Sequence, residues 1–364
     1  MAFRNRRTSR TNGIFAGTAL ASAIVFAPPA MADNECGPAV NDVAVCAPAN
    51  GPFPSGIAYR PITVNPFTLR LLPGTVVNQI NDDAGIGAAI FLRGVGGPLT
   101  IDGAGVNVSA SAAPEGAVFI RGTGSSPTSI TLGNVTNTTT TGAYSGQAIA
   151  IFGGGSATIN VGDVSSAGTV AGSNYYNAVV SVDVLRTQDY SSATVTTGAV
   201  TATGERMKGI AVGIRTPAFG DIAVTANGPI NVTSTGIQTN SSSTGRTTIV
   251  VNGAINAGGR GIDAFAAQSG SISITANANI VAGGDTGVRA SNIGGGDISV
   301  NTRSVTGVSH GIRAISQDFL SATGRSGNVA ITIADGSVVQ GEKAVRATAS
   351  NSDIVVTGRG ATLN

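Results

Sequence analysis

A short phrase of alternating apolar and polar positions returns along most of the chain. A Gly or Ala precedes an Ile or Val, and the following side chains alternate outward and inward, as in Gly236-Ile237-Gln238-Thr239 and Gly261-Ile262-Asp263-Ala264. The phrase recurs at intervals of about 24 to 33 residues, a period that is typical of solenoid proteins. Its branched residues are Ile90, Val118, Ile149, Val179, Ile210, Ile237, Ile262, Val288, Ile312 and Val345.

Each repeat contains two further alternating runs. In the clearest unit these are Ile222-Ala223-Val224 and Ile230-Asn231-Val232, which precede Ile237 and are separated from it by Gly, Asn, Ser and Thr. Three short strands and three turns in one period describe one coil of a parallel β-helix. The sequence therefore predicts an all-β fold, a right-handed parallel β-helix (solenoid) of about ten coils with an N-terminal cap.

The composition agrees with a narrow coil interior. The chain of 364 residues contains 52 Gly and no Trp, and only 11% of its residues are charged and 4% aromatic. Small and β-branched residues fill a thin cross-section, and Gly serves the tight turns. After the first 30 residues no apolar run reaches the length of a membrane-spanning helix.

The first 32 residues have the pattern of an export signal. Four arginines precede an apolar stretch over 14–26, and Ala30-Met31-Ala32 is a small-residue cleavage site that would leave Asp33 as the first residue. A membrane anchor is the alternative, but the apolar stretch is short for a bilayer. The 21 basic residues less these four leave 17 against 19 acidic ones, so the basic balance belongs to the signal.

Two cysteines, Cys36 and Cys46, follow the expected cleavage point. In an oxidising compartment such a pair closes a small disulfide loop. A metal site is the alternative, but the single histidine, His310, lies far along the chain.

Three segments follow from these patterns. We expect a signal peptide over 1–32, an N-terminal cap with the disulfide over 33–75, and β-helix repeats over 76–364. The last repeat ends at Asn364 within a coil, so we expect the chain to be part of a longer product.

The sequence offers little that resembles a catalytic or metal site, and we predict a protein that is not an enzyme and needs no cofactor. His310 is expected at a solvated turn, and Gly294-Gly295-Gly296-Asp297 does not recur as a calcium-binding repeat would. A polysaccharide lyase or hydrolase is the alternative, for which acidic residues would have to converge. The acidic residues are instead scattered about one per coil.

One outward column of the phrase contains Gln238, Asp263, Arg289, Arg313 and Arg346. We call Arg289, Arg313 and Arg346 the basic stripe. It could contact an anionic polysaccharide or lipid headgroups, and Asp263 could pair with Arg289 on the next coil. The pattern is more typical of a solvated face that stays charged against aggregation.

The Ala30-Met31-Ala32 site, the Cys36/Cys46 pair and the Gly/Ala-Ile/Val phrases together resemble the passenger domain of Gram-negative autotransporters, over residues 33–364. The resemblance implies export through the inner membrane to the cell surface, the outer membrane or the medium. It also implies a C-terminal translocator barrel in the full-length product. The expected role is adhesion, surface interaction or a stalk, with surface glycans or host matrix molecules as partners and no nucleic acid.

Overall fold

The computed structural model describes residues 35–60, 66–82, 87–140, 146–168, 177–184, 191–215, 219–318 and 326–364. All of them belong to one compact unit, Ala32–Asn364. The expected signal peptide, with Ala32 and Asp33, lies outside the described residues, as do residues 319–325, which follow β29 (His310–Ser316).

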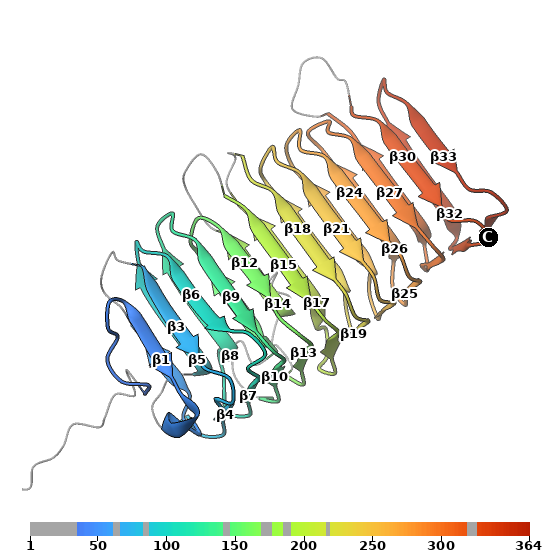
Figure 1. Cartoon of the computed structure of the whole chain (residues 1–364). Coiled ribbons are helices and arrows are strands. Elements are labelled where there is room, and N and C mark those ends of the chain that lie inside the picture. The colour runs from blue at the N-terminus through green and yellow to red at the C-terminus, as the bar shows by residue number, and fades with distance from the viewer. Residues whose placement is uncertain are drawn as a thin grey trace, which may run out of the picture. The chain divides into compact units, whose positions relative to one another are not determined.

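Three parallel sheets, here named A, B and C, form the solenoid (Figure 1). Apart from β1 and β3 in sheet A, neighbours in each sheet are three strands apart in the sequence, because the chain adds one strand to each sheet per coil. The all-β parallel solenoid predicted from the sequence is therefore confirmed.

Sheet A contains twelve strands: β1 (Val43–Cys46), β3 (Phe67–Leu71), β6 (Leu99–Gly103), β9 (Thr128–Leu132), β12 (Ala157–Asn160), β15 (Ala193–Thr197), β18 (Ile222–Ala226), β21 (Thr247–Val251), β24 (Ile272–Ala276), β27 (Ile298–Thr302), β30 (Val329–Ile333) and β33 (Ile354–Thr357). Sheet B contains eleven: β2 (Ile57–Tyr59), β5 (Ala88–Val95), β8 (Gly116–Thr123), β11 (Ile149–Phe152), β14 (Ala178–Val184), β17 (Lys208–Ile214), β20 (Ile237–Ser241), β23 (Ile262–Ala266), β26 (Thr286–Asn292), β29 and β32 (Lys343–Ala349). Sheet C also contains eleven: β4 (Val77–Gln79), β7 (Val108–Ala110), β10 (Val135–Asn137), β13 (Val164–Ser166), β16 (Val200–Ala202), β19 (Ile230–Val232), β22 (Ile255–Ala257), β25 (Ile280–Ala282), β28 (Val305–Thr306), β31 (Val338–Gln340) and β34 (Thr362–Leu363).

The helical content of the described part of the chain is one 3-10 turn, Pro48–Asn50. Within the same residues, no helix combines the length and the apolarity that crossing a membrane requires.

Inward side chains of sheet B stack in one column through the core. Ile237 pairs with Ile262, then come Val288, Ile312 and Val345, one residue per coil, as the repeated phrase predicts. The first four are fully buried, and burial of each such side chain contributes about 1.5–3 kcal/mol. Each coil covers the apolar face of the one before it, so stability accumulates along the stack.

The prediction was wrong by one residue at β14. Val180, not Val179, pairs with Ile149 and Ile210 in the inward column. Val179 and Val180 are equally apolar, so the first branched residue of the phrase does not show the register, although the run from Val180 to Val184 alternates in the sequence. Val179 takes the position that Ala or Gly occupies in the other repeats.

Glycines lie at that position in the later coils because the backbone of the next coil approaches closely. A Cβ atom on Gly261 would lie 2.5 Å from the carbonyl oxygen of Gly287 and 2.3 Å from Cγ2 of Ile280. Gly236 and Gly287 are similarly crowded, so this part of sheet B meets sheet C at a corner that has no room for a side chain.

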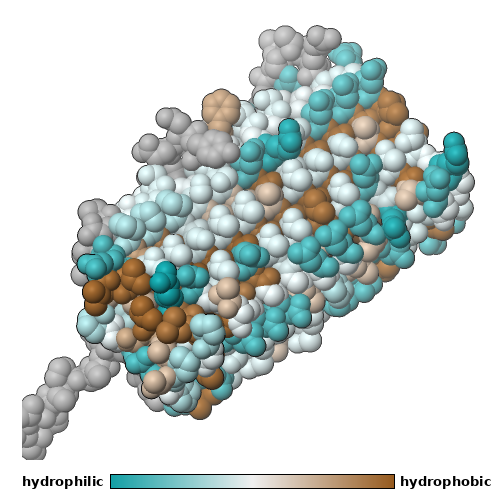
Figure 2. All heavy atoms as spheres, in the orientation of Figure 1, coloured by the Kyte–Doolittle hydropathy of each residue, from teal (hydrophilic) through white to brown (hydrophobic). Residues whose placement is uncertain are grey.

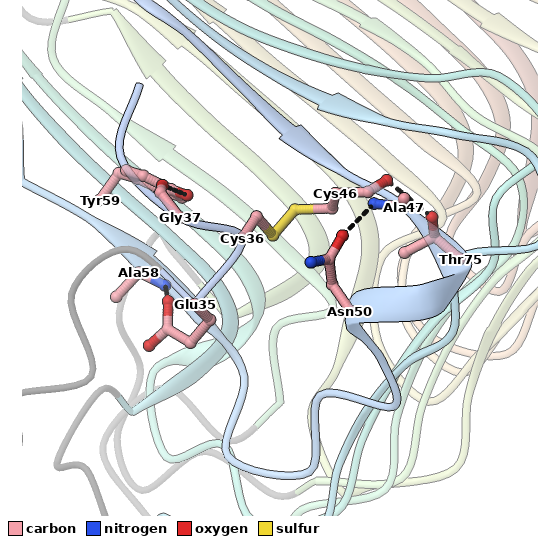
Figure 3. The surroundings of a disulfide bond; sticks show 9 residues. All are labelled: Glu35, Cys36, Gly37, Cys46, Ala47, Asn50, Ala58, Tyr59 and Thr75. Carbon is pink, nitrogen blue, oxygen red and sulfur yellow. Dashed lines mark hydrogen bonds between the residues drawn. A yellow bond between two sulfur atoms is a disulfide. The ribbon is translucent and has the colours of Figure 1, made fainter. Parts of the chain in front are cut away.

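At the N-terminal end a disulfide joins Cys36 to Cys46, with 4.8 Å between the Cα atoms (Figure 3). The Tyr59 hydroxyl donates to the carbonyl of Gly37 at 2.8 Å, and the backbone N–H of Ala58 donates to Glu35 at 2.8 Å. Burial raises the pKa of Tyr59 to about 12. Part of the segment expected as a cap already belongs to the sheets, since β1 pairs with β3 and β2 with β5.

Candidate functional site

Charged residues within the described strands are concentrated on sheet B. Sheet C strands contain none, and sheet A strands contain Arg70 and Asp102, which pair with each other at 3.2 Å. Figures 1 and 2 share one orientation, in which sheet A faces the viewer. In Figure 2 the strongly hydrophilic spheres gather mainly towards the turns, and much of the sheet A face is pale, which marks residues of intermediate hydropathy. The charged residues of sheet B strands are Arg93, Arg121, Asp183, Lys208, Asp263, Arg289, Arg313, Lys343 and Arg346.

Aromatic rings stack on the N-terminal part of the sheet B face. Phe91 and Phe119 pair across adjacent strands, with parallel rings 5.6 Å apart, and the ring of Phe152 lies 5.4 Å from that of Phe119. The guanidinium of Arg60 lies 5.6 Å from the centre of the Phe91 ring, within range of a cation–π contact. Arg93 and Arg121 pair in the next outward column and are exposed.

The middle of the face contains a buried carboxylate. Asp183 on β14 is 1% exposed, and its Oδ1 lies 3.0 Å from Nε of Arg215. Burial raises the pKa of Asp183 to about 6.

A neutral cluster of two arginines and two aspartates follows on the C-terminal side. Arg260 donates to Asp263 at 2.8 Å and to Asp285 at 2.9 Å, and Arg289 lies 3.6 Å from Asp263. The hydrogen bond from Ser309, followed by those from Arg260, lowers the pKa of Asp285 to about 2. Asp285 is therefore ionised, and arginines engage both aspartates within what we call the neutral cluster.

The basic stripe continues beyond the neutral cluster. Arg289, Arg313 and Arg346 pair in register on β26, β29 and β32, so their Cα atoms follow the strand spacing of about 4.8 Å. Within the described residues, no carboxylate lies within ion-pair distance of Arg313 or Arg346. Partial burial, and then the charges of Arg289 and Arg346, lower the pKa of Arg313. The Nε atoms of Arg289 and Arg313 are buried without a hydrogen-bond partner.

His310 lies at the start of β29, beside these cations. The residue pairs with Thr286 and with Lys343, and its Nδ1 is 3.0 Å from the Ser309 hydroxyl. Burial, and then the charges of Arg313, Lys343 and Arg346, lower its pKa. The side chain is 9% exposed and its Nε2 has no hydrogen-bond partner, so the expectation of a solvated histidine was wrong. His310 is buried because it begins a strand at the corner between sheets C and B.

No protein-family model, no curated protein and no solved structure matches this chain. The site is therefore interpreted from its own geometry.

The structure brings the predicted outward column together, from Gln238 and Asp263 to Arg346. Sequence reasoning missed Lys343 and expected His310 to be solvated. The signal for their alignment was available, since each lies two residues before the branched residue of its phrase, Ile312 or Val345. Sequence reasoning also missed the Phe91–Phe119 stack. The signal was available there, since both phenylalanines take the same place in the phrase as Asp263 and Arg289.

A polar groove of about 810 Å³ runs along the turns that precede sheet A strands. Asp221 and Asp297 line it, together with Arg246 and several serines and threonines. Each aspartate accepts a backbone hydrogen bond from the next coil, Asp221 from Arg246 at 2.7 Å and Asp297 from Asn328 at 2.8 Å. These carboxylates thus fix turns. In the described part of the chain no three His, Cys, Asp or Glu residues gather where they could hold a metal ion.

Proposed function

We propose that this chain is an exported, non-enzymatic cell-surface protein, similar to an autotransporter passenger, which serves as an adhesin or a stalk. The observation that carries the proposal is the concentration of strand charges on one of three faces. A solenoid that only had to fold could use the neutral strands of sheets A and C throughout. Sheet B instead carries outward arginines, beside an aromatic cluster in which Phe119 is buried and Phe91 and Phe152 are partly buried.

The mechanism in this proposal is geometric. Continuous hydrogen-bonded sheets hold outward side chains at a fixed spacing, so the side chains need little ordering when a partner binds. Many weak contacts along one rigid face then add up, because each contact that forms raises the effective concentration for the next.

Expression of the full chain in a Gram-negative host tests export. We expect the secreted or surface-exposed protein to begin at Asp33, as read by mass spectrometry, and to be cleaved by protease added to intact cells. A chain that lacks residues 1–32 is the control and should stay inside the cell. Retention of the complete chain in the cytoplasm, with residues 1–32 still attached, would contradict the proposal.

Adhesion is tested on cells that display the protein. We expect them to bind glycan-coated surfaces more than cells that display a variant in which Arg93, Arg121, Arg313 and Arg346 are replaced by Ser. Equal adhesion by the two would favour a stalk over an adhesin.

The alternative, a polysaccharide-active enzyme, would use the groove at sheet A, where two aspartates line a polar channel. Release of reducing or unsaturated ends from acidic polysaccharides, abolished in Asp221→Asn or Asp297→Asn proteins that still fold, would establish it. Under our proposal the purified protein releases none.

A further inference from the structure

The positive charge of the sheet B face is not balanced beyond the neutral cluster. Arg260, Asp263, Asp285 and Arg289 compensate one another through contacts of 2.8–3.6 Å. The next two coils add cations at Arg313, Lys343 and Arg346, with no acidic residue on β29 or β32. Like charges on directly opposite positions of neighbouring strands repel one another. A bound anion would reduce this repulsion.

The guanidinium groups of the stripe have unused hydrogen-bonding capacity. Arg313 and Arg346 have no ion pair among the described residues, so no carboxylate there occupies their Nη groups. A guanidinium presents two parallel N–H donors that match a carboxylate or a sulfate. Stacked guanidinium groups can therefore donate hydrogen bonds to anionic groups, both at their edges and between neighbouring coils.

The stripe is linear, and a smooth track lies beside it. The cations follow the solenoid axis at about one strand spacing, near 4.8 Å, on β26, β29 and β32. The adjacent outward column contains Ser291, Ile315 and Thr348, in register and without long side chains. A ligand with one anion per short repeat and a flat, partly apolar ring face fits both columns.

We propose that the basic stripe, together with Lys343, binds a linear acidic polysaccharide lengthwise, with about one anionic sugar per coil. Uronic acids and sulfated sugars share the required chemistry, because each carries a compact anion on a pyranose ring, and the repeat of a linear chain of such sugars is comparable with the strand spacing. The inference deepens the proposed function and rests on it for the presence of such a glycan outside the cell.

Nucleic acid and membranes fit the stripe less well. Single-stranded nucleic acids bind through bases stacked on aromatic rings, and β26, β29 and β32 contain no Phe, Tyr or Trp. Peripheral membrane binding combines basic residues with a broad apolar surface, whereas the outward aliphatic residue of these three strands is Ile315 alone.

Binding of purified protein, spanning residues 33–364, to defined polymers tests the inference. The probes are polygalacturonate and chondroitin sulfate, with dextran as the neutral polymer, and the measurement is isothermal titration calorimetry at two salt concentrations. We expect binding to both acidic polymers and none to dextran, and an affinity that falls as salt rises, because counterions are exchanged. Trigalacturonate should bind at least about tenfold more tightly than galacturonate monomer, since it would span neighbouring arginines.

Charge-matched variants separate the stripe from general electrostatics. Arg313→Ser with Arg346→Ser should weaken polygalacturonate binding at least about tenfold. Arg303→Ser with Arg359→Ser removes the same charge from exposed turns and should change it less than about twofold. Arg313→Lys keeps the charge but loses the two parallel N–H donors of the guanidinium, so its affinity for polygalacturonate should lie between those of wild type and the double variant. Circular dichroism and thermal unfolding establish that each variant folds.

Three results would overturn the inference. An equal loss in the two double variants would mean non-specific attraction. Tighter binding of single-stranded DNA or of anionic phospholipid vesicles than of either polysaccharide would point to another class of partner. Absence of binding to any acidic polymer at low salt would exclude the site. Since the protein is purified, these results are independent of whether export succeeds.

Discussion

Sheets A and B belong to the same coils and share the same strand spacing, yet their outer faces differ. On sheet A one outward column reads Thr100, Ser129, Thr158 and Thr194, in register, and consists of short neutral hydroxyls. On sheet B the corresponding stack of the last coils is Arg289, Arg313 and Arg346. Short hydroxyls stack at about 4.8 Å without repulsion, whereas arginines in the same geometry repel one another. Folding therefore accounts for the sheet A face, and the sheet B face needs another explanation.

The inner faces of the two sheets should be equivalent. Ile249 of sheet A and Ile262 of sheet B are both fully buried in the single core. We expect Ile249→Ala and Ile262→Ala each to lower the free energy of unfolding by about 2–5 kcal/mol, through lost burial and a cavity. Urea unfolding followed by circular dichroism measures both. A neutral result for one of them would show that the two sheets do not share the core equally.

The buried carboxylate of sheet B, Asp183, gives the stability of the protein a pH dependence. Burial raises the pKa of Asp183 to about 6, above the value near 3.8 expected in the unfolded chain. The folded state therefore holds its proton more tightly, and stability should fall as pH rises from about 4 to about 6. A shift of about two pKa units corresponds to at most roughly 3 kcal/mol.

Comparison of wild type with Asp183→Asn isolates this effect. The variant cannot ionise at this position, so its urea midpoint should change less than that of wild type between about pH 4 and pH 6. An identical pH profile for the two proteins would show that Arg215, 3.0 Å away, holds Asp183 ionised throughout this range.

Transfer of the arginine column to sheet A tests whether the repulsion depends on the face. Ser129, Thr158 and Thr194 lie in register on β9, β12 and β15. Their replacement by Arg should lower stability by about 1 kcal/mol at low ionic strength, with recovery as salt screens the charges. The matched control has Asp at Thr158 between two arginines and should lose less. Equal stability of the two variants would mean that outward charges on this fold are fully solvated.

The sequence could predict the fold because apolar and polar positions alternate regularly along its repeats. Inward Ile and Val alternate with outward polar residues from Ile237 to Val345, and this pattern defines both the coil and the register. At β14 the prediction followed the first of two adjacent valines, Val179, although the alternating run from Val180 to Val184 indicates the register. A slip of one residue exchanges the two faces of a strand, so the register has to be taken from the whole alternating run.

The site could be predicted only in part, for a related reason. The basic stripe follows from strand periodicity, so its three arginines were placed together. The pairing of His310 with Lys343 also follows from the phrase, since each lies two residues before its branched residue. The burial of His310 depends on how the chain turns the corner from sheet C to sheet B, which the spacing along the sequence does not reveal.

Removal of one arginine from the stripe has the smallest expected effect and the sharpest consequence. Arg313 lies between two like charges on a partly buried site, so Arg313→Thr gives this coil of sheet B the kind of outward residue that sheet A has. We expect it to raise the free energy of unfolding by about 0.5 kcal/mol at low salt, and less at high salt. The same substitution should weaken binding of polygalacturonate. Higher stability with weaker polygalacturonate binding would mean that Arg313 lowers stability and supports recognition. Lower stability together with weaker binding would make Arg313 a structural residue, and the contrast between the two faces would then have no functional cause.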